Sequence, residues 1–167
     1  AASDVYKRQA YLVGKTEAVK WGGIGCKGYI EVDFGSYSEE EISRAWEVLV
    51  DRHEMLRAKV TETGFEILER DEIDYEIEII NLQKMEEKEK TVTLSRIRED
   101  FSKYVFHTEN PPLFKVVITK RMEGNFFHLL VDLIVSDFAS VQILISEMGE
   151  LLKGCLLYTS PSPRDGA

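Results

Sequence analysis

Two apolar segments separated by one short turn constrain the fold of this chain more than any other feature. Residues 113–121 and 125–135 are rich in β-branched and aromatic side chains, and each is long enough to form a strand. Gly124 stands between them and supplies the backbone freedom that a tight turn needs. The sequence therefore predicts a β-hairpin at the centre of the fold.

Apolar residues recur at strand spacing or at helix spacing through most of the remaining chain. Strands are expected at 27–35 and 75–82, a second hairpin at 58–69, and helices at 36–56, 84–106 and 138–153. These elements do not alternate strictly as strand, helix and strand, so the sheet should not be wholly parallel. We therefore predict an α/β two-layer sandwich with a mixed or antiparallel sheet.

Each predicted helix has a stripe of apolar residues that should face the core. The first helix also has an N-terminal signal, because Ser38 and Glu41 have the spacing of a capping box. The positions expected to be buried are Ile42, Ala45, Trp46, Leu49 and Val50 in the first helix, Leu94, Ile97, Phe101, Tyr104 and Val105 in the second, and Val141, Leu144, Ile145, Met148, Leu151 and Leu152 in the third.

The composition indicates one domain with a substantial core and excludes several classes of function. Of the 167 residues, 44% are hydrophobic and 31% are charged, and no apolar run reaches the ~18–20 residues of a membrane span. The net charge of −9, with scattered basic residues, argues against nucleic-acid binding. The two cysteines and three histidines lack metal-ligand spacing, so we expect neither a metal site nor a disulfide framework. A cytoplasmic location is the default expectation.

The two ends of the chain do not continue the pattern of the residues beside them. The segment "DVYKRQ" (4–9) can be encoded by a DNA string whose reverse complement, read one base in, encodes "CLLYT" (155–159). This relation resembles a transposase-based sequencing adaptor translated at both ends. We therefore expect residues 1–9 and 155–167 to be adaptor-derived and residues 10–154 to be a fragment of a longer protein. A native disordered tail is the alternative.

A carboxylate inside the most apolar segment is the main candidate for function. Asp132 lies in the run 125–135, Asp137 follows five residues later, and Ser140 three further on. An ionised aspartate can accept a proton or orient a donor, but one at a strand end can also simply hydrogen-bond the next loop. Asp137 has the position of a helix cap, or it pairs with a guanidinium. Ser140 is not expected to be a nucleophile, because the sequence places no histidine base near it.

Five segments occur in an order that resembles the N-terminal half of a nonribosomal peptide synthetase condensation domain. They are "QAYLVGK" (9–15), "GGIGCKGYIEVDF" (22–34), "RHEMLRA" (52–58), "NPPLF" (110–114) and "DLIVSDFAS" (132–140). Together they extend over almost all of the segment treated as authentic. The resemblance implies a chloramphenicol-acetyltransferase-like fold, of which this chain has the N-terminal lobe only.

Within that family, the last segment is similar to the Asp-x4-Asp-x2-Ser signature of heterocyclization domains. Ordinary condensation domains have two histidines, three spacer residues, an aspartate and a glycine. This chain has Asp132 and Leu133 in place of the histidines, keeps the aspartate as Asp137, and has Phe138 in place of the glycine. The opening segment "AYLVGK" also agrees with that subtype, with Lys15 where arginine is usual.

The resemblance implies a reaction and a set of partners. Two lobes enclose a tunnel, which thioesters carried on the phosphopantetheine arms of carrier-protein domains enter from opposite sides. An amide forms first, the Cys, Ser or Thr side chain of the acceptor then attacks its carbonyl, and loss of water gives a thiazoline or oxazoline. The domain binds no cofactor directly. Its partners are the carrier-protein domains, the C-terminal lobe and other synthetase modules.

The resemblance also implies roles for individual residues. Arg57 pairs with Asp137 as structural scaffolding for the tunnel loop, and Tyr11 lines the acceptor side of the tunnel. Asp132, Asp137 and Ser140 form the motif, in which Asp132 orients substrate or accepts a proton, or is only structural. The main cyclodehydration residues belong to the second lobe, so the isolated chain is expected to be inactive and to self-associate through uncovered apolar surface.

Two other functions stay open at this point. One is an ordinary or stand-alone acyltransferase of the same superfamily, and the aspartate in place of histidine counts against it. The other is a non-catalytic docking or interface domain, which the loss of both histidines would fit. The joint presence of Arg57, Asp132, Asp137 and Ser140 counts against the second alternative.

Overall fold

The computed structural model describes residues 20–22 and 25–157. Along the chain its elements are β1 (Lys20–Gly22), β2 (Gly25–Asp33), α2 (Glu39–Arg52), the 3-10 helix η1 (Glu54–Arg57), β3 (Ala58–Thr61), β4 (Gly64–Ile67), the 3-10 helix η2 (Arg70–Glu72), β5 (Glu78–Asn81), α3 (Glu87–Lys103), β6 (Phe114–Arg121), β7 (Gly124–Asp132) and α4 (Phe138–Leu157). Both predicted hairpins and all three predicted helices are confirmed. β2 is as long as expected but begins two residues earlier, β5, β6 and β7 are shorter than expected, and α4 continues past its predicted end.

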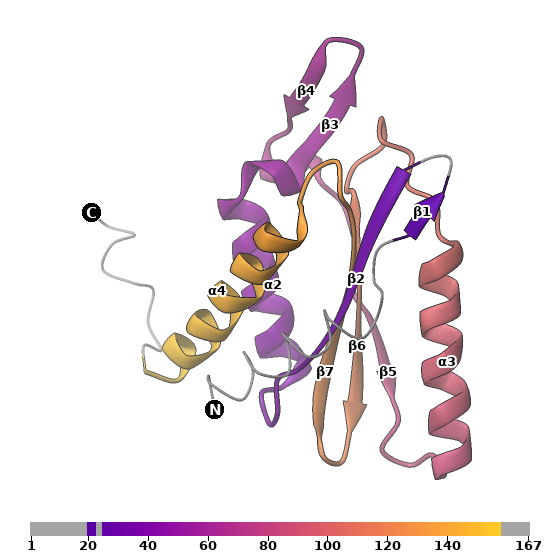
Figure 1. Cartoon of the computed structure of the whole chain (residues 1–167). Coiled ribbons are helices and arrows are strands. Elements are labelled where there is room, and N and C mark those ends of the chain that lie inside the picture. Colours follow the sequence, from indigo (N-terminus) through magenta and orange to yellow (C-terminus); the bar gives the residue numbers. More distant parts are fainter. Residues whose placement is uncertain (1–19, 23–24, 158–167) are drawn as a thin grey trace.

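Five of the strands form one mixed sheet in the order β1–β2–β7–β6–β5. The central strand β7 pairs antiparallel with β2 on one side and with β6 on the other. The edge strand β5 runs parallel to β6. A separate hairpin of β3 and β4 projects beyond the sheet at the top of Figure 1. The central position of β7 explains why its sequence is the most apolar in the chain, since strands in the middle of a covered sheet are buried on both faces.

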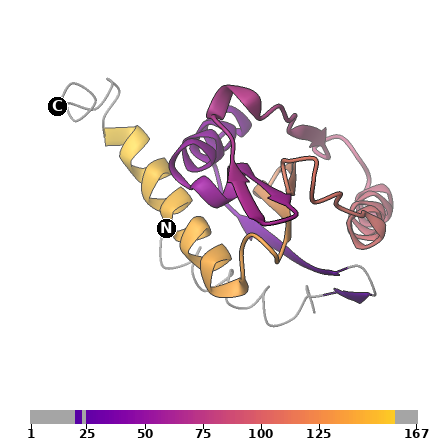
Figure 2. The same cartoon turned by 90° about the horizontal axis from the view of Figure 1, so that it is seen from above.

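Helices cover both faces of this sheet (Figures 1 and 2), so that the sandwich has a third layer in addition to the two expected. On one face, the ring of Trp46 in α2 contacts Phe114 and Phe127, at centroid distances of 5.1 and 5.5 Å. α4 lies beside α2 on that face. On the other face, Phe101 of α3 meets Tyr29 of β2 edge-on at 5.2 Å.

The capping and burial patterns of α2 and α4 follow the sequence closely. Ser38 accepts a hydrogen bond from the Glu41 amide, and the Glu41 carboxylate accepts one from the Ser38 amide, which confirms the capping box. All five expected positions of α2 are buried. The expected positions of α4 are buried as well, apart from the half-buried Leu151.

The prediction for α3 was wrong at its C-terminal end. The helix ends at Lys103, so Tyr104 and Val105 lie beyond it and are exposed, at 39% and 47% of their surface. Tyr104 already has extended backbone angles, and Lys27 of β2 donates hydrogen bonds to the carbonyls of Phe101 and Ser102 at the end of the helix. No helix within the described ranges is long and apolar enough to cross a membrane.

Candidate functional site

Asp132 is the last residue of β7, and its side chain organises the turn that follows. Its amide donates to the Leu113 carbonyl at 3.0 Å. Its Oδ1 accepts from the Ile134 amide at 3.0 Å, and its carbonyl accepts from the Val135 amide at 3.1 Å. The residue is 9% exposed. A side-chain oxygen that caps its own turn in this way is typical of aspartate at the end of a strand.

Asp137 caps the N-terminus of α4. Its Oδ1 accepts from the Ser140 amide at 2.8 Å, and its carbonyl accepts from the Val141 amide at 2.9 Å. Hydrogen bonds from the Ser140 amide and hydroxyl hold the pKa of Asp137 below its usual value. Ser140 lies on the exposed first turn of the helix. The geometry is therefore that of the helix cap considered from the sequence.

The expected ion pair between Arg57 and Asp137 is not formed. The Arg57 guanidinium donates instead to three backbone carbonyls, from Nε to Val50 at 3.0 Å, from Nη1 to Leu68 at 2.7 Å and from Nη2 to Asp51 at 3.3 Å. Val50 and Asp51 lie in the last turn of α2, where helical carbonyls lack partners within the helix. Arg57 satisfies those carbonyls, while the Asp137 carboxylate satisfies amides at the start of α4.

A cavity of about 610 Å³ nevertheless brings Arg57 and the motif serine to one place. Residues from the end of α2, from η1 and from the start of α4 line it, including Arg57, Ser136, Ser140 and Ile143. The Ser136 hydroxyl is buried and has no hydrogen-bond partner among the described residues. Asp132 is not among the lining residues. The motif residues therefore lie in two places, with Ser140 at this cavity and Asp132 at the end of a strand of the sheet.

Glu147 of α4 contacts two residues at the end of α2, Arg52 and His53, which line this cavity. Its Oε1 accepts from Arg52 Nη1 and lies near His53 Nε2, both at 2.9 Å. Burial alone would raise the pKa of Glu147, but the hydrogen bonds with His53 and Arg52 hold it below its usual value. His53 is also the C-cap residue of α2.

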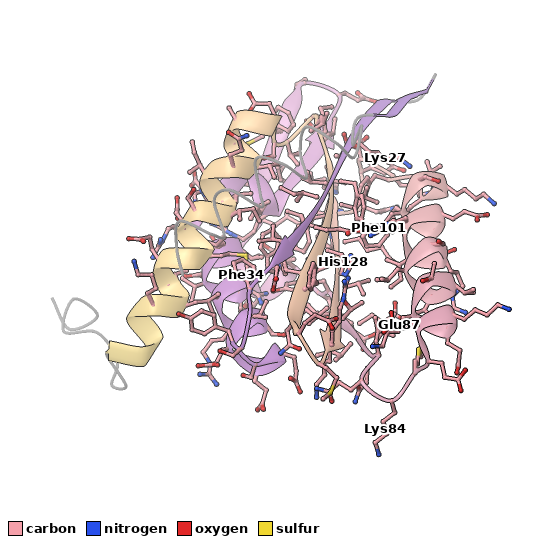
Figure 3. The ribbon with its side chains drawn as sticks, turned by 60° about the horizontal axis from the view of Figure 1, so that its bottom comes forward. Lys27, Phe34, Lys84, Glu87, Phe101 and His128 are labelled. Atoms are coloured by element: carbon pink, nitrogen blue, oxygen red, sulfur yellow. The ribbon has the colours of Figure 1, made fainter. Side chains whose placement is uncertain are left out.

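Sequence analysis missed a buried polar cluster between the sheet and α3. The Glu31 carboxylate accepts two hydrogen bonds from Arg98 of α3, at 2.6 Å from Nε and 2.8 Å from Nη2. It also accepts one from the Tyr29 hydroxyl. His128 of β7 lies with Nδ1 3.0 Å from the Tyr29 hydroxyl and Nε2 2.9 Å from Thr119 Oγ1. Figure 3 shows His128 on the side of the sheet that faces α3.

Burial and charge set the protonation states of this cluster. Burial alone would raise the pKa of Glu31, but the hydrogen bonds from Arg98 and the nearby His128 ring hold it well below its usual value. Burial lowers the pKa of His128 despite the nearby Glu31 carboxylate. Burial and the Glu31 charge raise the pKa of Tyr29. At neutral pH the cluster therefore consists of an ionised Glu31, a neutral His128 and a phenolic Tyr29.

One histidine tautomer satisfies these hydrogen bonds. With the proton on Nδ1, His128 donates to the Tyr29 hydroxyl oxygen, whose own proton is donated to Glu31. Nε2 then accepts from the Thr119 hydroxyl, whose oxygen accepts from Arg121 Nε at 3.3 Å. The signal for this cluster in the sequence was the polar alternate positions of 27–35, which did not indicate the partners.

Two further points concern Tyr11 and metal binding. Tyr11 falls outside the described residues. No group of three histidine, cysteine, aspartate or glutamate side chains in the described ranges could hold a metal ion.

Comparison with known proteins gives a single family. Residues 33–162 match the family model of the condensation domain. The matched range includes the first residues of the C-terminal segment for which we expect an adaptor origin, and that origin stays a prediction. The match also includes Arg57, Asp132, Asp137 and Ser140.

The relatives are much longer than this chain. Pyochelin synthetase PchF of Pseudomonas aeruginosa is 24% identical over 139 residues, which make up 83% of this chain and 8% of the relative. Bacitracin synthase 1 of Bacillus licheniformis is 29% identical over 146 residues, which make up 85% of this chain and 3% of the relative. The chain thus spans less than a tenth of the length of either.

Among solved structures, the EpoB nonribosomal peptide synthetase cyclization-docking bidomain from Sorangium cellulosum is similar, with a TM-score of 0.68 at 25% identity. The alignment covers 95% of this chain and 31% of that one. This likeness confirms the expected chloramphenicol-acetyltransferase-like α/β fold and its restriction to one lobe.

Proposed function

The chain belongs to the condensation-domain family, and on that premise we propose that it is part of a nonribosomal peptide synthetase domain that joins two carrier-bound thioesters through an amide bond. The observation that carries this proposal is the family match over residues 33–162, which includes the segment from Asp132 to Ser140. In this reaction the acceptor amine attacks the donor thioester carbonyl. The carbon–nitrogen bond forms and the carrier thiol leaves.

We further propose the heterocyclization subtype. The Asp-x4-Asp-x2-Ser spacing of Asp132, Asp137 and Ser140 supports it, and so does the similarity to a cyclization-docking bidomain. In the second step the Cys, Ser or Thr side chain of the acceptor attacks the new amide carbonyl. The carbonyl oxygen leaves as water, and a thiazoline or oxazoline ring is formed.

Within this proposal the motif residues have different tasks. Asp132 is 9% exposed and ends the central strand, and we assign it the orientation of substrate or the acceptance of a proton. Asp137 fixes the start of α4, so that Ser140 stays at the wall of the 610 Å³ cavity. Arg57, which also lines that cavity, holds the turn after α2. Tyr11 lines the acceptor side of the tunnel.

The proposed partners are a second lobe and the carrier-protein domains. The chain corresponds to 31% of the cyclization-docking bidomain, and we propose that a second lobe completes the tunnel. The substrates arrive on the phosphopantetheine arms of carrier-protein domains, and the domain itself binds no cofactor. The chain alone should therefore be inactive.

The test is an acyl-transfer assay on the complete domain that contains residues 10–154. A donor thioester on one carrier is offered either a cysteinyl or a serinyl thioester on a second carrier, or a free alcohol. The heterocyclization proposal predicts a condensed product lighter by one further water molecule. Asp132→Ala should reduce that product, whereas Lys103→Met, on the exposed side of α3, should not.

The alternatives give different products in the same assay. A product that keeps the mass of the open amide would support an ordinary condensation domain and refute ring closure. An ester formed with the alcohol would support the ester-forming acyltransferase. No product with any acceptor, from a folded domain and loaded carriers, would favour the docking or interface role.

A further inference from the structure

The helix α3 is attached to the sheet by few apolar side chains. Only Thr93, Ile97 and Phe101 among its described residues are buried. The helix is otherwise held by charged groups of β2, which are Glu31 near its middle and Lys27 at its C-terminal end. Such a helix depends on its polar anchors more than one with a full apolar stripe.

Lys27 caps the C-terminus of α3. Its Nζ donates to the carbonyls of Phe101 at 3.1 Å, of Ser102 at 2.8 Å and of Tyr104. A cation at this position meets the negative end of the helix dipole and satisfies carbonyls that have no partner within the helix. Figure 3 shows Lys27 and Phe101 close together where β2 passes the end of α3.

Lys27 is also the cross-strand partner of Asp132. The two residues are paired in the register of β2 and β7, as are Tyr29 with Leu130 and Glu31 with His128. Directly opposed residues point to the same face of a sheet, with Cβ atoms about 4.5–5.5 Å apart. Lys27, Tyr29, Glu31 and Asp132 therefore share the face that α3 covers. The motif residue Asp132 is therefore the cross-strand neighbour of the lysine that holds the helix end.

We propose that Lys27 is a positioning residue that couples the docking of the α3 C-terminus to the placement of the Asp132 carboxylate. The significance of this coupling for catalysis rests on the function proposed above, although its existence does not. With α3 docked, three carbonyls hold the ammonium of Lys27, and Lys27 keeps its cross-strand position opposite Asp132. When the helix end leaves the sheet, Lys27 loses those acceptors, and the turn built on Asp132 loses a fixed cationic neighbour.

Amide exchange measured by NMR on the 167-residue chain tests this directly. The Ile134 amide donates to Asp132 Oδ1 and so reports the carboxylate, and the Tyr104 amide donates to the Phe101 carbonyl and so reports the helix end. Lys27→Met should speed exchange at both amides. The expected change at Ile134 is about two- to fivefold, as for the loss of an opposite-charge cross-strand pair.

Matched variants separate positioning from general loosening. Lys27→Arg keeps the charge and should restore slow exchange at Ile134. Lys103→Met removes a lysine from the same helix end, where the side chain is 73% exposed, and should leave Ile134 unchanged. If Lys27→Met does not fold, Asp132→Asn gives the reciprocal measurement, because coupling between two groups acts in both directions. Exchange at Tyr104 should then increase.

The outcomes are distinct. Faster exchange at Tyr104 with no change at Ile134 would make Lys27 a helix cap only and overturn the coupling. No change at either amide would overturn both parts. Equal acceleration by Lys103→Met would show that loosening of α3 alone moves the turn. None of these results depends on activity, so a failure of the synthetase proposal in the product assay is seen separately.

Discussion

Replacing Arg98 with methionine should lower the free energy of unfolding by about 2–3 kcal/mol, because it leaves the Glu31 carboxylate buried without its main cation. The Glu31 side chain is 4% exposed, and Arg98 approaches it at 2.6 Å. Breaking a fully buried pair costs about 3–5 kcal/mol, and an exposed pair contributes about 0.2–1 kcal/mol. Arg98 is 50% exposed, so water screens part of the interaction and an intermediate value is expected.

Urea unfolding of the 167-residue chain at neutral pH measures this value. Methionine keeps the apolar stem of Arg98, so the loss is mainly that of the charge. The control is Lys103→Met, which removes a lysine paired with Glu99 on the solvent side of the same helix, where the two side chains are 73% and 62% exposed. The control should leave the free energy of unfolding nearly unchanged, because water screens an exposed ion pair.

A double-mutant cycle with Glu31→Gln then identifies the source of the loss. The double variant should be less destabilised than the sum of the two single variants, because the glutamine leaves no unpaired buried charge. Equal costs for Arg98→Met and Lys103→Met, or strict additivity in the cycle, would refute the view that this ion pair anchors α3.

Three further measurements test other parts of the structure. Gly124→Ala should cost about 1–3 kcal/mol in the same urea assay, because φ is +149° and a Cβ would lie 2.8 Å from Asp33 Oδ1. Gly149→Ala, where a Cβ on α4 would meet no atom within 4 Å, should instead stabilise the fold by about 0.5–1 kcal/mol. Asp137→Ala should lower the midpoint of thermal unfolding because the helix cap is lost, and Asp137→Asn, which retains a capping oxygen, should lower it little. Burial lowers the pKa of His128 below its unfolded value of about 6.5. The contribution of His128 to stability is therefore complete above that pH and is lost as the pH falls toward the folded pKa, by at most about 1.4 kcal/mol per pH unit. His128→Gln should remove that part of the slope between pH 6.5 and the onset of carboxylate protonation, and an unchanged slope would refute the assignment.

Local patterns predicted the elements that local physics controls. The spacing of Ser38 and Glu41 fixed the start of α2, and the apolar stripes of α2 and α4 identified their buried faces. Gly124 located the central hairpin, where its positive φ and close neighbours leave no room for a side chain. These features depend on residues a few positions apart, which a single sequence displays.

Pairings between distant residues could not be predicted in the same way. Arg98 is 67 positions from Glu31, and either could have remained solvated on the surface. The parallel pairing of β5 with β6 and the position of α3 on the second face depend on the path of the whole chain. The partner of Arg57 was mispredicted for the same reason. Its guanidinium binds carbonyls at the end of α2, and the Asp137 carboxylate is already used as the cap of α4.

The position of Asp132 in the most apolar segment follows from the two faces of β7. Phe127, Leu129 and Val131 point toward α2 and α4 and form the core, whereas His128 and Asp132 point toward α3. Asp132 is thus the last member of a row of polar side chains that begins with the Glu31–His128 pair. Leu130 lies between His128 and Asp132 in this row, so the polar positions of β7 are not consecutive and the strand reads as apolar. Arg98 and Lys27 hold to β2 the helix that covers this row, so the strand face that carries Asp132 depends on charged contacts far away in the sequence.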